Sequence, residues 1–133
     1  MKRGVLIFWV VVIVVIVAGV GTSLFVKSGP GELDGFAQCL KDKGAIFYGA
    51  FWCPHCQATK RLFGKSAKLL PYVECSTSDG QSQLQICKDK NITGYPTWVF
   101  ADESILTGER TLQELADKTS CQLPEGIGIH VQR

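Results

Sequence analysis

The feature that most constrains the fold is an uninterrupted apolar run near the N-terminus. Residues 5–26 carry no charged side chain and are almost wholly apolar, and Lys2 and Arg3 precede them. Twenty-two residues at helical rise reach about 33 Å, which is enough to cross the hydrocarbon core of a bilayer. We therefore predict a single N-terminal transmembrane helix, a signal-anchor within residues 1–27.

A cleaved signal peptide is the alternative, because it would share the basic start and the apolar run. Signal peptides usually have an apolar region of about 7–15 residues that ends at a small-residue cleavage site. Here the run is longer, and Ala18, Gly19 and Gly21 lie inside it without an A-x-A motif. This pattern favours the uncleaved anchor.

The charges that flank the run predict the side of the membrane on which the rest of the chain lies. Lys2 and Arg3 flank the short N-terminal side, whereas only Lys27 follows the run closely. The positive-inside rule then places the domain on the extracytoplasmic side, periplasmic or extracellular. The six cysteines indicate the same side, because disulfides form and persist in oxidising compartments.

Beyond the apolar run, the composition predicts one small domain. Residues 28–32 (SGPGE) break any continuing helix and are expected to be a linker. Residues 33–121 form the expected domain, and residues 122–133 a flexible C-terminal tail in which His130 is inert. The net charge is +2 and no basic patch is present, so no nucleic-acid partner is expected.

The order of elements predicted after the linker is helix, strand, helix, strand, helix, strand, strand, helix. The expected helices are residues 34–43, 54–69, 83–90 and 111–120, and the expected strands are residues 45–51, 72–75, 97–101 and 104–107. Thr111 and Glu114 have the spacing of a capping box at the start of the last helix. This order predicts an α/β layered fold with a hairpin at one sheet edge. The basic residues of the second helix are interpreted as a solvated face: Lys60, Arg61, Lys65 and Lys68.

The sequence FWCPHC at residues 51–56 lies where a buried strand is expected to meet a helix. The thiolate is the nucleophile in thiol chemistry, and a helix N-terminus with its unpaired N–H groups stabilises a thiolate at Cys53. Pro54 suits the first helical turn, and His55 is expected to tune the sulfur by charge or hydrogen bonding. Cys56 lies on the same side of the helix and is expected to resolve a mixed disulfide.

Two other interpretations of the CxxC pair stay open. One is half of a zinc site, although Cys75 and Cys87, the other half, have eleven residues between them and form no knuckle. The other is a structural Cys53–Cys56 disulfide, although closing so short a loop removes little chain entropy. We favour the redox pair and expect no metal and no organic cofactor.

The remaining four cysteines are interpreted as structural. Cys75 follows a strand and Cys87 lies on the next helix, so a disulfide between them is favoured over a second redox relay or free buried thiols. Cys39 and Cys121 then pair by elimination, although sequence alone does not fix connectivity.

The motif WCPHC at residues 52–56, together with Tyr95-Pro96-Thr97, resembles the active site of the thioredoxin superfamily. The resemblance covers roughly residues 33–120 and implies a thioredoxin-like fold, a central mixed sheet with helices on both faces. It implies that Pro96 is cis and lies against the CxxC pair, and that Tyr95 offers its backbone to an extended substrate. Trp52 is expected to border the same substrate-binding site.

More narrowly, residues 47–56, 72–75 and 94–98 resemble the thioredoxin-like domain fused to bacterial vitamin K epoxide reductase homologues. In those fusions the domain passes electrons from substrate thiols to a quinone-reducing membrane domain. No such four-helix domain is found in the 133 residues, so we expect a partner of that kind in trans. Many thioredoxins have a buried acid at the position of Phe47, which helps deprotonate the resolving cysteine, and its absence disfavours a reductase.

These patterns predict an extracytoplasmic thiol–disulfide oxidoreductase. Its CPHC pair is expected to oxidise cysteines of exported proteins and to pass electrons to a membrane quinone reductase. The alternatives are a disulfide reductase or isomerase supplied with electrons from the cytoplasm, and a membrane-anchored binding module with inert cysteines.

Overall fold

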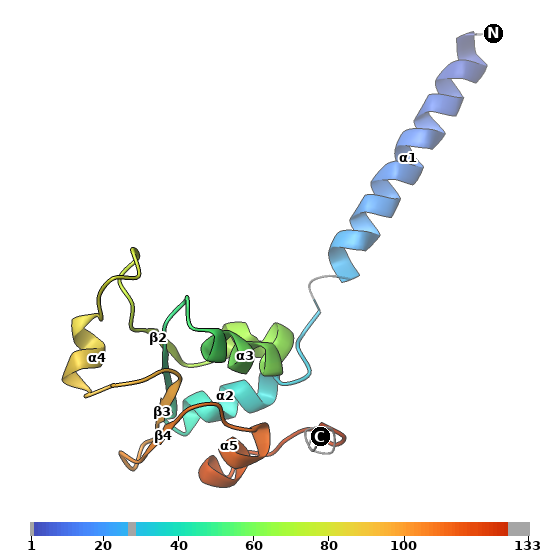
Figure 1. The fold of residues 1–133 in the computed structure, drawn as a ribbon. Helices are drawn as coiled ribbons and strands as arrows, with labels where there is room; N and C mark the ends of the chain where they lie inside the picture. Colours follow the sequence, from blue (N-terminus) through green and yellow to red (C-terminus); the bar gives the residue numbers. More distant parts are fainter. Residues whose placement is uncertain (1, 27–28, 128–133) are drawn as a thin grey trace. The chain divides into compact units, whose positions relative to one another are not determined.

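The computed structural model describes residues 2–26 and 29–127, which fall into two compact units divided after Pro30. The first unit consists of helix α1 (Lys2–Val26), and the second begins at Gly31 and holds every other element (Figure 1). The predicted linker and tail lie partly on residues 27–28 and 128–133, outside the described residues, as does His130. The predicted domain boundaries stay predictions.

Helix α1 is long and apolar enough to cross a membrane. Its segment Arg3–Val20 has a mean hydropathy of 2.7, and none of it is buried inside the protein. A continuous apolar surface of this extent is typical of contact with lipid or another apolar partner. The helix is therefore a candidate membrane span, as the sequence predicts.

The second unit is built on a four-stranded mixed sheet in the order β2-β1-β3-β4. Strand β1 pairs in parallel with β2 and antiparallel with β3, and β3 pairs antiparallel with β4. The strands are β1 (Ile46–Gly49), β2 (Tyr72–Glu74), β3 (Thr97–Val99) and β4 (Ile105–Thr107). The central strand β1 is therefore paired on both sides, as its apolar sequence predicts.

Helices cover both faces of the sheet unequally (Figure 1). Buried side chains of α2 (Asp34–Asp42), α3 (Pro54–Phe63) and α5 (Leu112–Thr119) share one core with Phe47 and Trp98 of the sheet. Tyr48 lies on the opposite face, where it packs with Cys87 of α4 (Gln85–Asp89). The expected thioredoxin-like fold, a mixed sheet between helices, is confirmed.

The helix expected over residues 54–69 is divided in two. Helix α3 ends at Phe63, and residues Gly64–Leu69 form a 3₁₀ helix, η1. Gly64 has φ +51°, a conformation that glycine adopts without the steric cost of a side chain and that ends the α-helix. Within η1, the Ser66 hydroxyl accepts a hydrogen bond from the Leu33 N–H at 3.1 Å, which fixes the chain just before α2.

Helix α5 begins at the predicted capping box. The Thr111 hydroxyl oxygen accepts a hydrogen bond from the Glu114 N–H at 3.1 Å, and the Glu114 carboxylate accepts one from the Thr111 N–H at 2.7 Å. Two N–H groups that would lack intrahelical partners are thereby satisfied.

Two disulfides join the elements of the second unit. One links Cys39 of α2 to Cys121, just after α5, and spans 82 residues of sequence. The other links Cys75, just after β2, to Cys87 of α4 and spans 12 residues. Cys53 and Cys56 are the two cysteines left free.

Replacing both Cys39 and Cys121 with alanine is expected to lower the free energy of unfolding by about 2–5 kcal/mol, because the disulfide restricts the unfolded chain. In the chain-entropy model this loss exceeds that of the matched Cys75→Ala/Cys87→Ala variant by about 1–2 kcal/mol, since the longer loop is the more restricted. Urea denaturation of the full chain in detergent without reductant measures both. Equal losses would show that strain or packing outweighs loop length.

Candidate functional site

The candidate site is the turn that leads from β1 into α3. Cys53 is the N-cap residue of α3 and Pro54 occupies the first helical position. The Cys53 Sγ accepts a hydrogen bond from the Cys56 N–H at 3.4 Å. The sulfur of Cys53 thus takes the place of a capping oxygen and lies at the positive end of the helix dipole.

Cys56 differs from Cys53 in its surroundings. Its side chain is fully buried against the sheet, whereas Cys53 retains 4% of its surface exposed. Burial raises the pKa of the Cys56 thiol to about 12, and the Ala50 backbone and the Lys60 charge act in the opposite direction. Cys56 is therefore a thiol at neutral pH in the reduced pair, and Cys53 is the sulfur of the pair that retains some exposure.

Tyr95, Pro96 and Trp52 lie together beside Cys53. The Tyr95–Pro96 peptide bond is cis, and the Tyr95 carbonyl oxygen lies 3.7 Å from the Cys53 Sγ. The Trp52 ring meets the Tyr95 ring edge-on at 6.1 Å between centroids. The Trp52 indole N–H donates to the Ser76 hydroxyl oxygen at 2.8 Å, and its ring is half exposed. A backbone carbonyl and an exposed aromatic side chain therefore border the Cys53 sulfur.

His55 is turned toward an acidic residue that sequence analysis missed. Its Nδ1 lies 2.5 Å from the Glu109 Oε1, and both side chains are largely exposed. Glu109 comes from the segment between β4 and α5, so the pair connects that segment to the first turn of α3. The ring that sequence analysis expects to tune Cys53 thus has a carboxylate as its partner.

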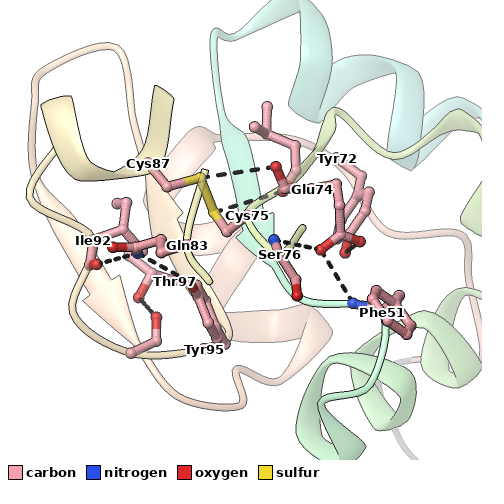
Figure 2. The surroundings of a disulfide bond; sticks show 12 residues. Phe51, Tyr72, Glu74, Cys75, Ser76, Gln83, Cys87, Ile92, Tyr95 and Thr97 are labelled. Carbon is pink, nitrogen blue, oxygen red and sulfur yellow. Dashed lines mark hydrogen bonds between the residues drawn. A yellow bond between two sulfur atoms is a disulfide. The ribbon is translucent and has the colours of Figure 1, made fainter. Parts of the chain in front are cut away.

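A second group of residues missed from the sequence surrounds Tyr72, and Figure 2 shows its Glu74 side chain among its partners. The Glu74 carboxylate accepts hydrogen bonds from the N–H groups of Phe51 at 3.2 Å and Ser76 at 2.9 Å, and from the Tyr72 hydroxyl at 2.7 Å. Lys60 Nζ lies 3.5 Å from the Tyr72 ring centroid. The interpretation of Lys60 as solvated is therefore wrong, because its ammonium packs on an aromatic face. The strand alternation that puts Tyr72 and Glu74 on one face was the available signal.

Gly49 allows Cys56 to approach the sheet. A Cβ atom at Gly49 would lie 2.8 Å from the Cys56 Sγ and 2.9 Å from the Tyr72 Cε2, closer than real Cβ contacts. The bare backbone of the last residue of β1 therefore creates the space in which the sulfur of Cys56 is buried.

The zinc site considered for the CxxC pair lacks the second pair of ligands that it required. Cys75 and Cys87, which it required, are bonded to each other. Within residues 2–26 and 29–127, no group of three or more His, Cys, Asp or Glu side chains is arranged to hold a metal ion.

A Gly49→Ala variant is expected to lose about 1–3 kcal/mol of stability, because its Cβ overlaps the Cys56 sulfur. It should also slow reactions of the Cys53–Cys56 pair with a model disulfide. Gly35→Ala is the matched control, since its Cβ would meet nothing within 4 Å in helix α2 and alanine favours the helix. Thermal denaturation and thiol-exchange rates check both variants, and an unperturbed Gly49→Ala protein would contradict the close approach.

The two active-site thiols are expected to differ in alkylation. In the reduced protein at pH 7, iodoacetamide should modify Cys53 first, because Cys56 is fully buried and its raised pKa keeps it protonated. In a Cys53→Ser variant, alkylation of Cys56 should stay slow through pH 9 and accelerate only toward higher pH. Mass spectrometry of quenched samples measures the rates, and fast labelling of Cys56 at pH 7 would contradict this assignment.

Comparison with known proteins identifies the family to which the second unit belongs. The thioredoxin family model matches residues 33–120. The thiol-disulfide oxidoreductase LTO1 of Arabidopsis thaliana is 44% identical over 93 residues, which cover 67% of this chain and 24% of that protein. The chain thus spans about a quarter of the length of this curated relative. The fold, the CxxC pair at the start of α3 and the family match agree, and the chain belongs to the thioredoxin family.

Proposed function

We propose that this chain is a membrane-anchored thiol–disulfide oxidoreductase that works through Cys53 and Cys56. The observation that carries the proposal is the position of Cys53, whose sulfur caps helix α3, contacts the backbone of Cys56 and lies beside the cis Tyr95–Pro96 bond. The relative whose name describes this activity supports it from a different direction, over the part of its length that the chain matches.

The proposed cycle starts from a Cys53–Cys56 disulfide. A substrate thiolate attacks the Cys53 Sγ, the Cys53–Cys56 bond breaks, and Cys56 leaves and takes up a proton. A second substrate thiolate then attacks the substrate sulfur of the mixed disulfide and releases Cys53 as a thiolate. The substrate has lost two electrons and gained a disulfide, and the pair has become a dithiol. The α3 N-terminus stabilises the leaving Cys53 thiolate, and a stable leaving group speeds this step.

Oxidation is the proposed direction because Cys53 caps the N-terminus of α3. Helix N-termini stabilise thiolates, and a stabilised reduced form makes the corresponding disulfide a better oxidant. The fully buried Phe47 occupies the position at which many thioredoxins have a buried acid, and that acid supports reductase turnover. The Cys39–Cys121 and Cys75–Cys87 disulfides suit an oxidising compartment.

The proposed location is the extracytoplasmic side of a membrane, with α1 as the anchor. The basic residues ahead of α1 and the structural disulfides of the second unit support this side. The proposed substrates are exported proteins that contain cysteines. The proposed electron acceptor is an integral membrane quinone reductase that acts in trans and resembles the vitamin K epoxide reductase homologues. The sequence resemblance at residues 47–56, 72–75 and 94–98 supports this acceptor.

The redox state of the pair in cells tests the proposal. Cells are quenched with acid, free thiols are tagged with a bulky alkylating reagent, and the full chain is compared with its Cys53→Ser and Cys56→Ser variants. We expect the wild-type pair to be mostly disulfide. The Cys56→Ser variant should collect mixed disulfides that form when Cys53 attacks oxidised substrates, because no Cys56 thiol is present to attack the Cys53 Sγ and release them. The Cys53→Ser variant should not collect them.

Controls separate the alternatives. A mostly dithiol pair would favour the reductase or isomerase, and unchanged cell function in the Cys53→Ser variant would favour the binding module. A membrane-impermeant reagent applied to intact cells after mild reduction should tag Cys53, and protection from it would contradict the extracytoplasmic location.

A further inference from the structure

Two charged residues, Glu74 and Lys60, lie near the redox pair, and the proposed mechanism uses neither of them. Strands β1 and β2 pair in parallel, with Phe47 opposite Tyr72 and Gly49 opposite Glu74. Residues opposite each other in a sheet point to the same face. Tyr72 and Glu74 therefore lie on the face where Cys56 packs against Gly49. Strand β2 thus brings the Tyr72 phenol and the Glu74 carboxylate close to Phe47, which occupies the position of the buried acid of many thioredoxins.

The Glu74 carboxylate is held at this place by three hydrogen bonds. Two come from the N–H groups of Phe51 and Ser76, and the third comes from the Tyr72 hydroxyl (Figure 2). Phe51 is two residues before Cys53, so one of these bonds fixes the active-site turn itself. Because these hydrogen bonds hold the carboxylate in one position, its charge stays at a fixed distance from the neighbouring groups.

A positive charge is held on the same tyrosine. Lys60 follows Cys56 by one turn of α3, and its Nζ lies 3.5 Å from the Tyr72 ring centroid. The Lys60 charge acts to lower the pKa of Cys56, against the larger effect of burial. Burial, the Glu74 hydrogen bond and charge, and lesser effects of Cys56 and Cys53 raise the pKa of Tyr72. The Tyr72 phenol therefore lies within electrostatic range of both charges and of both sulfurs.

On the basis of the proposed function, we propose that Glu74 and Lys60, held on opposite parts of Tyr72 beside Cys56, set the reduction potential of the Cys53–Cys56 pair in opposite directions. The disulfide form is neutral, whereas a thiolate formed in the reduced pair carries negative charge. A nearby carboxylate disfavours the reduced form and lowers the potential. A nearby ammonium favours the reduced form and raises it. Both are positioning residues, because neither bonds to a reacting sulfur.

The equilibrium with glutathione measures this effect. Oxidised glutathione takes two electrons from the reduced pair: its own S–S bond breaks, the Cys53–Cys56 bond forms, and the two glutathione sulfurs take up two protons from the pair and from water. The full chain in detergent is equilibrated with mixtures of reduced and oxidised glutathione. The fraction of reduced pair is then read by alkylation and mass spectrometry.

Glu74→Gln keeps an oxygen for the two backbone N–H groups and removes the charge. We expect it to shift the equilibrium threefold to tenfold toward the dithiol, a rise of about 14–30 mV in potential. Lys60→Gln should shift the equilibrium by a similar factor toward the disulfide. Glu103→Gln and Lys43→Gln are the matched controls. They remove the same charges at the opposite end of the sheet strands, and neither should change the equilibrium.

The Glu74→Asp variant separates the effect of the Glu74 charge on the potential from the contribution of its hydrogen bonds to stability. It keeps the carboxylate on a shorter side chain, so it should lower the melting temperature and leave the potential close to that of the wild type. A purely structural role for Glu74 predicts a lower melting temperature for Glu74→Gln with an unchanged potential, and this result would overturn the inference.

The remaining outcomes are also decisive. Shifts of the same sign in Glu74→Gln and Lys60→Gln would overturn the inference. If Glu74→Gln does not fold, Lys60→Gln decides alone, and an unchanged potential in that variant rejects the proposal. If the wild-type pair forms no disulfide at any glutathione ratio, the proposed function itself fails, and that result is distinct from a reversible pair whose potential ignores both charges.

Discussion

The contact between the Cys56 sulfur and the bare backbone of Gly49 is the constraint on which the rest of the site depends. Because the central strand ends without a side chain, helix α3 approaches the sheet closely enough to bury its second cysteine completely. That approach fixes the first turn of the helix, and with it the position of Cys53 at the N-cap. The close packing of strand against helix thus sets the geometry of the sulfurs.

The same packing places the two cysteines of one short motif in different surroundings. Cys53 lies at the helix N-terminus, where N–H groups and the dipole favour negative charge. Cys56 lies three residues further on in an apolar environment that disfavours it. One sulfur is suited to meet partners from solution, and the other is protected until a mixed disulfide forms. A difference of this kind follows from position along a helix and needs no difference in residue type.

Local patterns allowed much of this structure to be predicted from the sequence. The apolar run, the buried strand before the CxxC motif and the capping box at Thr111 each depend on residues close in sequence. Contacts between distant segments were not predictable in this way. In the sequence, Lys60 belongs to a basic helix face. Its contact with the Tyr72 ring forms only because β2 packs beside α3 in the folded chain. Glu109 meets His55 across 54 residues of sequence. The break at Gly64 was missed because a single glycine inside a helical pattern is often tolerated.

The Cys39–Cys121 disulfide has a consequence for the order in which the molecule is made. The redox pair and the other disulfide both lie inside the loop that it closes. This bond therefore has to wait until the chain has been synthesised as far as Cys121, whereas Cys75 can meet Cys87 much earlier. The last bond to become available is thus the one that encloses all the other cysteines, and it leaves Cys53 and Cys56 as the free pair.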